Sequence, residues 1–258
     1  METQVERPLP HPSEELAGNA VGPPLPELSP AAEVALLART LFREGYDDHL
    51  AGHITSRQPD GTYLVNPYGL TWDEITAADV MRIDANGVTI EGKWTVSPAV
   101  TLHLAVHEVR DDVGVVVHNH PVYGTLWADA HRIPPVYDQT GSYVLGDPVL
   151  YGEYEGIVVD WEVCRRIAAK VVDARVALLA NHGVLVMAPD IKVAHHRAVT
   201  LEWRSRQAWR LEAMGGGVPM PVETTADISA VFDIAPFPHM WEAMVRRELR
   251  ADPSILDE

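Results

Sequence analysis

The chain has 258 residues, 47% hydrophobic and 22% charged, which suits one medium-sized domain with a complete core and excludes a disordered chain. Its formal net charge of -17 leaves no basic face for a phosphate backbone, so we expect no nucleic-acid partner and weak repulsion of anionic substrates. No apolar run approaches the roughly 20 residues of a membrane helix, so we expect no membrane partner.

Residues 1–30 carry scattered prolines and few large apolar side chains. This composition predicts an extended or disordered arm, which can lie on a partner subunit. The arm also lacks the basic-then-apolar order of a signal peptide. A cytoplasmic location is therefore the default expectation.

The first predicted helix begins at Ala31 and ends at Gly45, with an apolar face formed by Val34, Leu37, Ala38 and Leu41. A strand at the end of residues 50–57, a turn at 59–61 and a strand at 63–66 predict a first hairpin. Residues 71–74 resemble a capped helix entry. A second hairpin is predicted from residues 80–84 and 88–91, joined by the Asn-Gly turn at 86–87.

A helix is predicted from Pro98 through Arg110, with Leu102, Val106 and Val109 on one face. His103 and His107 lie four residues apart on it, which is one possible spacing for two metal ligands. The protease-type pattern needs a glutamate directly after the first histidine, and Leu104 stands there. We therefore favour a supporting or surface role for both histidines over direct metal binding.

The valine-rich run at residues 113–120 predicts a buried strand that Pro121 ends. Side chains two apart on a strand share a face, so His118 and His120 can converge on one ion while Asn119 points away. Two histidines on an apolar strand can also be core residues that bond backbone carbonyls. The pair becomes informative only beside a third ligand.

Residues 124–152 are predicted to be a loop that lines a pocket mouth with polar groups from Tyr123, Tyr137, Asp138, Tyr143 and Tyr151. A helix is expected at 161–172, in which Cys164 is a buried, inert thiol without a disulfide partner. A long helix is expected at 191–214, ended by the glycines at 215–217. A tail with a short helix near residues 239–249 follows.

The third ligand candidate is His182, between predicted strands at 176–180 and 184–187, beside Gly183, which lets the backbone turn tightly. Three neutral imidazoles that leave an open position suit zinc, manganese or iron(II). The strands interleave with helices, and no nucleotide-binding motif is present, which predicts an α/β layered fold. We expect three segments: an arm at 1–30, a domain at 31–214 and a tail at 215–258.

Five short segments together resemble the class II aldolase and adducin-head family over roughly residues 31–214. They are residues 51–57 (AGHITSR), 66–69 (NPYG), 84–87 (DANG), 117–121 (VHNHP) and 181–183 (NHG). The resemblance implies a three-layer α-β-α sandwich around a mainly antiparallel sheet. It also implies a homotetramer with active sites at subunit interfaces, and one divalent metal per subunit on His118, His120 and His182.

The departures from the family's sugar-phosphate aldolases bear on the substrate. Ala99 stands where those enzymes carry a glutamate that moves the substrate proton. His53 replaces the asparagine of the phosphate-binding glycine loop, and Pro98 replaces one of two paired serines, although Ser97 and Gly69 remain. A phosphosugar substrate is therefore disfavoured.

We predict a metal-dependent carbon-carbon lyase that acts on a small hydroxy or oxo carboxylic acid, with decarboxylation favoured over aldol cleavage. Alanine cannot carry a proton, whereas a metal that chelates the acid can hold the electron pair left by carbon dioxide. Zinc or manganese is favoured, with iron(II) as the alternative. The carbanion's proton can come from His53, Tyr68, Tyr137 or water.

Other side chains have a functional and a structural interpretation. Gly69 and Ser97 are candidate substrate contacts, and His53 can contact the substrate or cap a turn. Arg57 can bind the carboxylate or form a surface or inter-subunit ion pair. Asp138 can orient a metal ligand or cap a turn. Arg197, Trp203 and Arg204 are expected to pack or to form an interface.

Two rival functions remain. Three histidines can hold iron(II) in an oxygenase, since some relatives of the family resemble non-haem iron oxygenases. The fold can also serve assembly alone, as in adducin heads, but that role predicts loss of the metal histidines, and all three are present.

Overall fold

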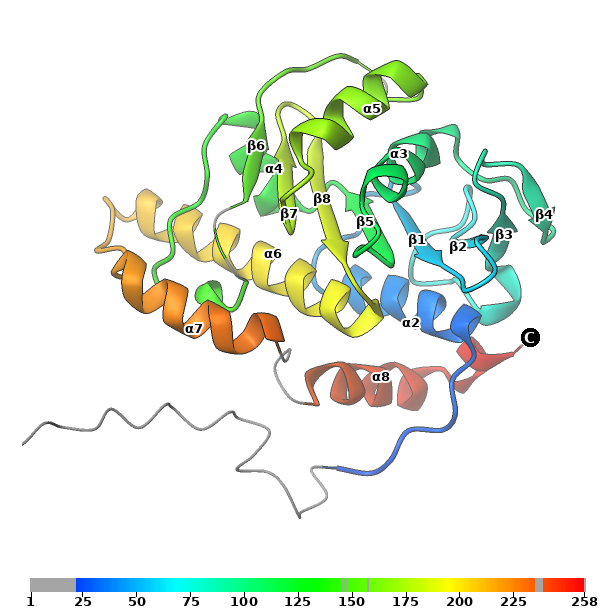
Figure 1. Cartoon of the computed structure of the whole chain (residues 1–258). Coiled ribbons are helices and arrows are strands. Elements are labelled where there is room, and N and C mark those ends of the chain that lie inside the picture. The colour runs from blue at the N-terminus through cyan, green and yellow to red at the C-terminus, as the bar shows by residue number, and fades with distance from the viewer. Residues whose placement is uncertain (1–21, 145, 147, 157, 235–238, 258) are drawn as a thin grey trace, which may run out of the picture.

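The computed structural model describes residues 22–144, 146, 148–156, 158–234 and 239–257 (Figure 1). Most of the predicted N-terminal arm, residues 1–21, lies outside the described part. The strands are β1 His53–Arg57, β2 Tyr63–Val65, β3 Met81–Ile83, β4 Thr89–Glu91, β5 Val115–Asn119, β6 Val149–Tyr151, β7 Val176–Leu179 and β8 Gly183–Ala188. The α-helices are α2 Pro30–Phe42, α3 Thr101–Val109, α4 Val122–Asp129, α5 Trp161–Lys170, α6 Ile191–Ala213, α7 Val222–Ile234 and α8 Met240–Ala251. Short 3-10 helices are η1 Ala77–Asp79, η2 Pro98–Val100, η3 Thr140–Ser142 and η4 Pro253–Leu256.

One sheet of eight strands organises the described residues, in the order β4-β3-β2-β1-β5-β8-β7-β6. Every neighbouring pair is antiparallel except β6 with β7. The predicted α/β fold with a mainly antiparallel sheet is therefore confirmed. β5 lies between β1 and β8, so the histidine-bearing strand is an inner strand of the sheet.

Helices cover both faces of the sheet and make three layers (Figure 1). Val115 and Val117 of β5 pack in the cluster that includes α2 and α6, whereas Val116 packs against α3 and α5. This alternation follows from the two-residue period of a strand, and each fully buried valine stabilises the fold by roughly 1.5–3 kcal/mol. His118, two residues after Val116, shares the α3 face.

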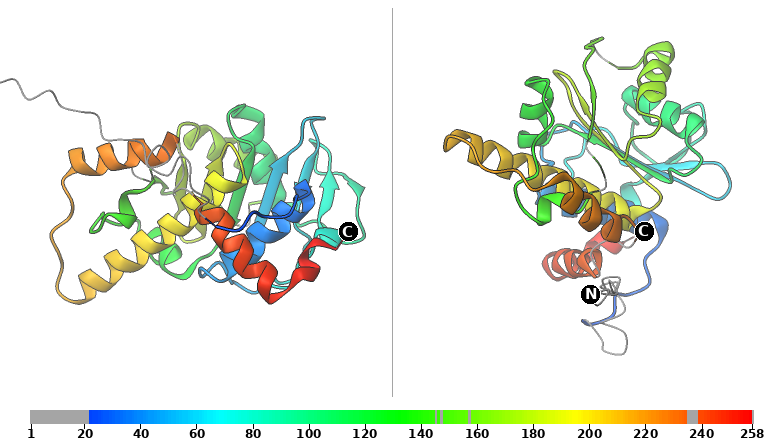
Figure 2. Two further views of the ribbon diagram at one scale, coloured as in Figure 1. Left: turned by 90° about the horizontal axis from the view of Figure 1, so that it is seen from below. Right: turned by 60° about the vertical axis from the view of Figure 1, so that its left-hand side comes forward.

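Both ends of the chain's described part meet below the sheet. The segment before α2 runs beside α8, where the Arg246 guanidinium donates to the Pro23 carbonyl (Figure 2). Arg43, which follows α2, forms an ion pair with Glu248 of α8 at 2.7 Å. The predicted C-terminal helix therefore exists and packs against the domain.

Several local predictions were wrong. The expected loop at 124–152 overlaps α4, and the tail contains α7 as well as α8. The predicted cap at Thr71 does form, with Glu74 accepting from the Thr71 N–H at 2.8 Å, but it closes only a turn. Val109 is 45% exposed, because α3 ends there and turns it away from the core.

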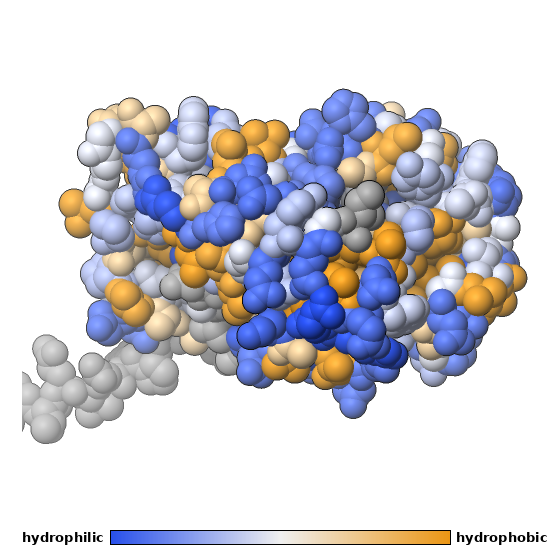
Figure 3. All heavy atoms as spheres, turned by 90° about the horizontal axis from the view of Figure 1, so that it is seen from above, coloured by the Kyte–Doolittle hydropathy of each residue, from blue (hydrophilic) through white to orange (hydrophobic). Residues whose placement is uncertain are grey.

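Two observations concern surface and solvent. Across the face seen from above, hydrophilic and apolar side chains are interspersed (Figure 3). Among the described residues, no helix is both long and apolar enough to cross a membrane.

Cys164 is buried in α5, and burial raises the pKa of its thiol to about 11, in agreement with the inert thiol that was predicted.

Candidate metal centre

The sheet brings the three predicted metal ligands together. His118 is on β5 and His120 follows its end, while His182 lies in the turn between β7 and β8. One ligand atom from each ring lies within 4.8 Å of the others. The ring centroids are 5.1 Å apart for His118 and His120, 4.7 Å for His118 and His182, and 5.1 Å for His120 and His182.

The turn that presents His182 depends on two neighbours. Asn181 has a φ of 56°, in the left-handed region that asparagine tolerates better than most residues. Gly183 was predicted to permit a tight turn. In the structure, its lack of a side chain lets β8 lie close to His120 and Asn119. A Cβ at Gly183 would lie 2.4 Å from His120 Cδ2 and 2.7 Å from the Asn119 carbonyl oxygen. Any larger residue there would push β8 away from the histidines.

Hydrogen bonds fix how two of the rings face the centre. His118 Nδ1 donates to the Val184 carbonyl at 2.8 Å, and His120 Nδ1 donates to Asp48 Oδ2 at 2.7 Å. Each bond leaves the lone pair on Nε2, the atom that a metal would take. His120 Nε2 is buried and has no hydrogen-bond partner within the described part of the chain. An orphaned, buried lone pair of this kind fits a metal ligand.

The electrostatics also favour neutral imidazoles. Burial, followed by the neighbouring His120, lowers the pKa of His182 to about 4. Burial lowers the pKa of His118 well below its usual value, and the surrounding histidines add to the effect. A metal needs the neutral form of the ring.

Asp48 is a contributor that the sequence did not reveal. It lies in the loop between α2 and β1, and 72 residues separate it from His120. Its pKa is lowered first by the hydrogen bond with His49 and then by the bond with His120. Asn119 holds the same loop, since its side-chain amide donates to the Ala51 carbonyl at 3.2 Å.

His53 lies beside the triad. It pairs with His118 across β1 and β5, and the two rings stack with centroids 5.7 Å apart. The side chain is 8% exposed, and Nδ1 has no hydrogen-bond partner among the described residues. Burial, then His120 and His182, lower its pKa to about 4. His53 is thus placed to contact anything bound at the three histidines.

Three further candidates lie at the same end of the sheet. Asn66 accepts from the Ile54 N–H at 2.7 Å and so joins the loop of Tyr68 and Gly69 to the start of β1. The Tyr68 N–H donates to the Thr95 carbonyl, and the Tyr68 side chain is 52% exposed. Ser97, two residues after Thr95, is buried, and its side chain accepts from the Ala99 N–H as the cap of η2.

Two candidates lie elsewhere. Arg57 is at the opposite end of β1 from His53, and its guanidinium donates to the carbonyls of His107 and Arg110. A guanidinium committed to the end of α3 is not available as the predicted fork for a substrate carboxylate. Tyr137 packs against Gly217, and no contact in the described structure joins it to the histidines.

The remaining polar candidates have structural roles. Asp138 accepts from Trp203 Nε1 at 3.0 Å and from the Gly141 N–H at 2.8 Å, so it caps a turn and does not orient a metal ligand. Arg204 donates to the Pro134 carbonyl at 2.7 Å, and Arg197 donates to the Met187 carbonyl. These contacts agree with the packing role that was predicted.

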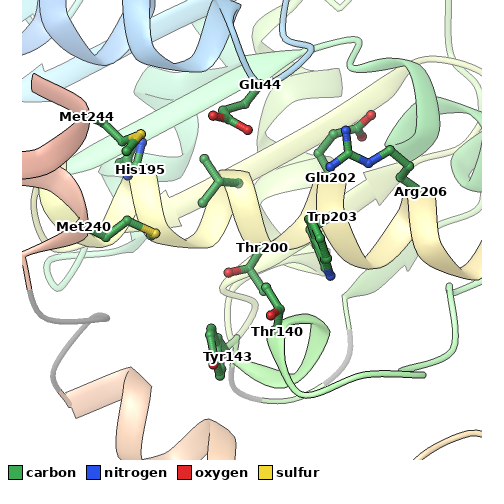
Figure 4. A pocket seen from close by; sticks show the side chains of 11 residues that line it. Glu44, Thr140, Tyr143, His195, Thr200, Glu202, Trp203, Arg206, Met240 and Met244 are labelled. Atoms are coloured by element: carbon green, nitrogen blue, oxygen red, sulfur yellow. The ribbon is translucent and has the colours of Figure 1, made fainter. Parts of the chain in front are cut away.

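A separate cavity of about 300 Å³ opens beside α6 (Figure 4). His195, Met240 and Met244 lie at one end of it, and Glu202 and Arg206 lie at the other. Glu202 connects this region to the histidines, because its carboxylate accepts from the N–H groups of Tyr123 and Gly124 at 3.0 and 2.8 Å. It therefore caps α4, the helix that begins directly after His120 and Pro121.

A family model described as the Class II Aldolase and Adducin N-terminal domain matches residues 32–209. A solved aldolase II superfamily protein from Pseudomonas syringae has a TM-score of 0.76 and 24% identity, over 90% of this chain and 98% of that chain. The three-layer fold that the sequence predicted is the fold of that protein.

Several curated relatives have named activities. The 4-hydroxy-3-prenylphenylpyruvate oxygenase/4-hydroxy-3-prenylbenzoate synthase of Streptomyces roseochromogenus subsp. oscitans is 32% identical over 195 residues, 73% of this chain and 70% of the relative. Decarboxylase NovR of Streptomyces niveus is 34% identical over 166 residues, 62% of this chain and 61% of the relative. The matched part of the chain thus spans about two thirds of these relatives.

Proposed function

This chain belongs to the class II aldolase and adducin N-terminal domain family, and from that premise we propose that it is a divalent-metal-dependent carbon-carbon lyase. We further propose that its substrate is a small hydroxy or oxo carboxylic acid and that decarboxylation is favoured over aldol cleavage. The observation that carries the proposal is the convergence of His118, His120 and His182 without a carboxylate at position 99.

The three histidines are the proposed ligands. Bound there, a zinc or manganese ion would act as a Lewis acid toward the electron pair that departing carbon dioxide leaves. The chain itself orients the rings through the Val184 carbonyl and Asp48. It also excludes water from one side, because His53 and His118 are both buried.

Ala99 supports decarboxylation over aldol cleavage. It lies in η2, directly before α3, and its methyl group can neither accept nor donate a proton. Aldol cleavage requires such a group at the hydroxyl that becomes a carbonyl, whereas decarboxylation needs only an electron acceptor and a later proton. We propose that His53 and Tyr68 contact the substrate and that His53, Tyr68, a neighbouring chain's Tyr137 or water supplies this proton.

An iron(II) oxygenase is the second candidate. One observation favours it, the 32% identity to a protein named an oxygenase and synthase. Three histidines with open positions would suit iron(II) as well as zinc. A purely structural role is disfavoured, because an assembly domain has no need of the converging neutral imidazoles.

The quaternary proposal is a homotetramer with active sites at subunit interfaces. Tyr137, a candidate proton donor, lies apart from the histidines of its own chain, so it can act at this site only from a neighbouring chain. In such an assembly, a side chain that is remote within one subunit can reach the histidines of the next.

The first test is metal content. We expect one zinc or manganese ion per chain in purified protein, and none in a His118→Ala, His120→Ala variant. His239→Ala, an exposed histidine before α8, is the matched control and should keep its metal. Equal metal content in all three proteins would place the ion elsewhere and contradict the site.

The second test is the reaction. Metal-loaded protein, kept under nitrogen, should release carbon dioxide from a hydroxy-aromatic or oxo acid, and the double variant should not. Release that appears only in air, together with oxygen uptake and bound iron, would support the oxygenase and contradict the lyase.

A further inference from the structure

His103 is a second buried histidine, besides His53, that lies near the three histidines and is not one of the proposed ligands. Its ring lies 5.7 Å from that of His53 and 6.5 Å from that of His118, measured between centroids. The side chain is fully buried, and Nε2 has no hydrogen-bond partner in the described structure. His103 lies in the first turn of α3, four residues after Ala99 of η2.

A chain of hydrogen bonds leads from His103 to the backbone. Thr55 Oγ1 lies 3.1 Å from His103 Nδ1 and 2.9 Å from His107 Nε2. His107 Nδ1 in turn lies 3.2 Å from the Val113 carbonyl oxygen. All three side chains are buried, so water does not compete for these bonds.

The carbonyl end decides where each hydrogen lies. A carbonyl only accepts, so His107 carries its hydrogen on Nδ1, and burial, followed by Arg57, keeps the ring neutral by lowering its pKa to about 3. His107 Nε2 is then a lone pair that must accept the single hydroxyl hydrogen of Thr55. The Thr55 oxygen is left to accept from His103 Nδ1. His103 therefore carries a bare, buried lone pair on Nε2.

We propose that these hydrogen bonds hold His103 as a hydrogen-bond acceptor in the active site. Its Nε2 accepts a hydrogen bond from a hydroxyl group of the substrate and so selects hydroxylated acids. The inference rests on the proposed function for its substrate class. A buried acceptor without a donor is unfavourable, a cost that a substrate hydroxyl would offset and a methyl ether would not.

The hydrogen position can be measured without any substrate. In zinc-loaded protein with ¹⁵N-labelled histidine, the resonances lost in His103→Gln identify His103. We expect their chemical shifts to show Nδ1 protonated and Nε2 bare. Thr55→Val should mix the two tautomers, and Thr55→Ser should restore one. Thr40→Val, a buried threonine of α2 whose hydroxyl donates to the Leu37 carbonyl, is the matched control and should change nothing. A hydrogen on Nε2 in the wild type would overturn the inference.

Selection is tested by paired probes on the metal-loaded protein. The probes are 4-hydroxybenzoate against 4-methoxybenzoate, and mandelate against α-methoxyphenylacetate. The hydroxyl member of at least one pair should bind about tenfold more tightly, the effect of one buried hydrogen bond. This affinity ratio should approach one in His103→Leu. It should also fall in Thr55→Val and be restored in Thr55→Ser.

The outcomes separate the two proposals. A hydroxyl preference that survives unchanged in His103→Leu overturns the selecting role, even if the acid is decarboxylated. A preference that depends on His103, in a protein that releases no carbon dioxide, supports the inference and contradicts the lyase. Failure of all four probes to bind overturns the selecting role whatever the tautomer.

Discussion

At the residue scale, the site depends on which atoms orient the histidines. Asp48 holds His120 through a bond of 2.7 Å, and the ring then offers Nε2. Carboxylates in this position raise ligand basicity and fix the ring. The adjacent Asp47 is exposed, and the His120 Nδ1 bond goes to Asp48 and not to Asp47, so the chain provides its own control.

We therefore predict that Asp48→Asn weakens metal binding by about 10- to 100-fold, the usual effect of losing such a partner. Asp47→Asn should bind as the wild type does. Competition with a chromophoric chelator measures both affinities, and circular dichroism checks the fold. Equal affinities for the two variants would contradict the orienting role of Asp48.

Gly183→Ala tests whether the site needs the start of β8 to lie close to His120. The added Cβ would lie 2.4 Å from His120 Cδ2, so either the strand or the ring must move, which typically costs about 1–3 kcal/mol of unfolding free energy. We expect lower stability and weaker metal binding together. At Gly152 an added Cβ meets nothing within 4 Å, so Gly152→Ala should change neither quantity. Thermal unfolding with and without metal measures both, and an unaltered Gly183→Ala would refute the packing argument.

The sequence predicted that the three histidines converge and missed the residues that support them, for a physical reason. His118, His120 and His182 stand at strand ends, and strand periodicity is a local signal. Asp48 reaches His120 only because the loop before β1 folds back onto β5, a contact across 72 residues that no local pattern encodes. The role of Arg57 was hidden for the same reason, because its bonds to the carbonyls of His107 and Arg110 span 50 and 53 residues.

At the scale of elements, long periodic segments were predictable and weakly patterned ones were not. The long helix expected at 191–214 is α6, Ile191–Ala213. α4 escaped prediction because Gly124 interrupts a short segment that tertiary contacts stabilise, with Trp127 buried and Glu202 capping the first turn. α7 follows a proline-rich segment and has little apolar periodicity.

The Glu202 cap gives a prediction about pH. Burial raises the pKa of Glu202 to about 7, and the nearby Asp47 adds to the rise. The N–H groups of Tyr123 and Gly124 and the charge of Arg206 lower this pKa, but by less than burial raises it. The folded state therefore binds this proton more tightly than the unfolded chain, whose value is 4.5. The resulting stability is complete below pH 4.5 and is lost as pH rises to about 7.

We predict that the wild type loses on the order of 3 kcal/mol of unfolding free energy relative to Glu202→Gln between these two pH values. Urea unfolding across the range measures the difference. Glu223→Gln, at an exposed residue of α7, should run parallel to the wild type. A difference that stays constant with pH would show that Glu202 is ionised throughout.

At the scale of the whole molecule, the sheet gathers most of the site at one end, with one candidate missing. His53, Tyr68, Gly69 and Ser97 lie at the end of the sheet that carries the three histidines, as their registers and turns require. Tyr137 lies against Gly217, near the C-terminal end of α6. If Tyr137 takes part in the reaction, a neighbouring chain must bring it.

Subunit mixing tests this last step. We predict that the protein is a homotetramer by light scattering, with a mass four times 28.4 kDa. The His118→Ala, His120→Ala variant and Tyr137→Phe should each be inactive alone. Unfolded together in equal amounts and refolded, they should recover about a quarter of the activity, because random assembly joins intact histidines to a neighbour's intact Tyr137 at that frequency. No recovery would mean that histidines and Tyr137 must come from one chain, and a fully active Tyr137→Phe would remove the tyrosine from the reaction.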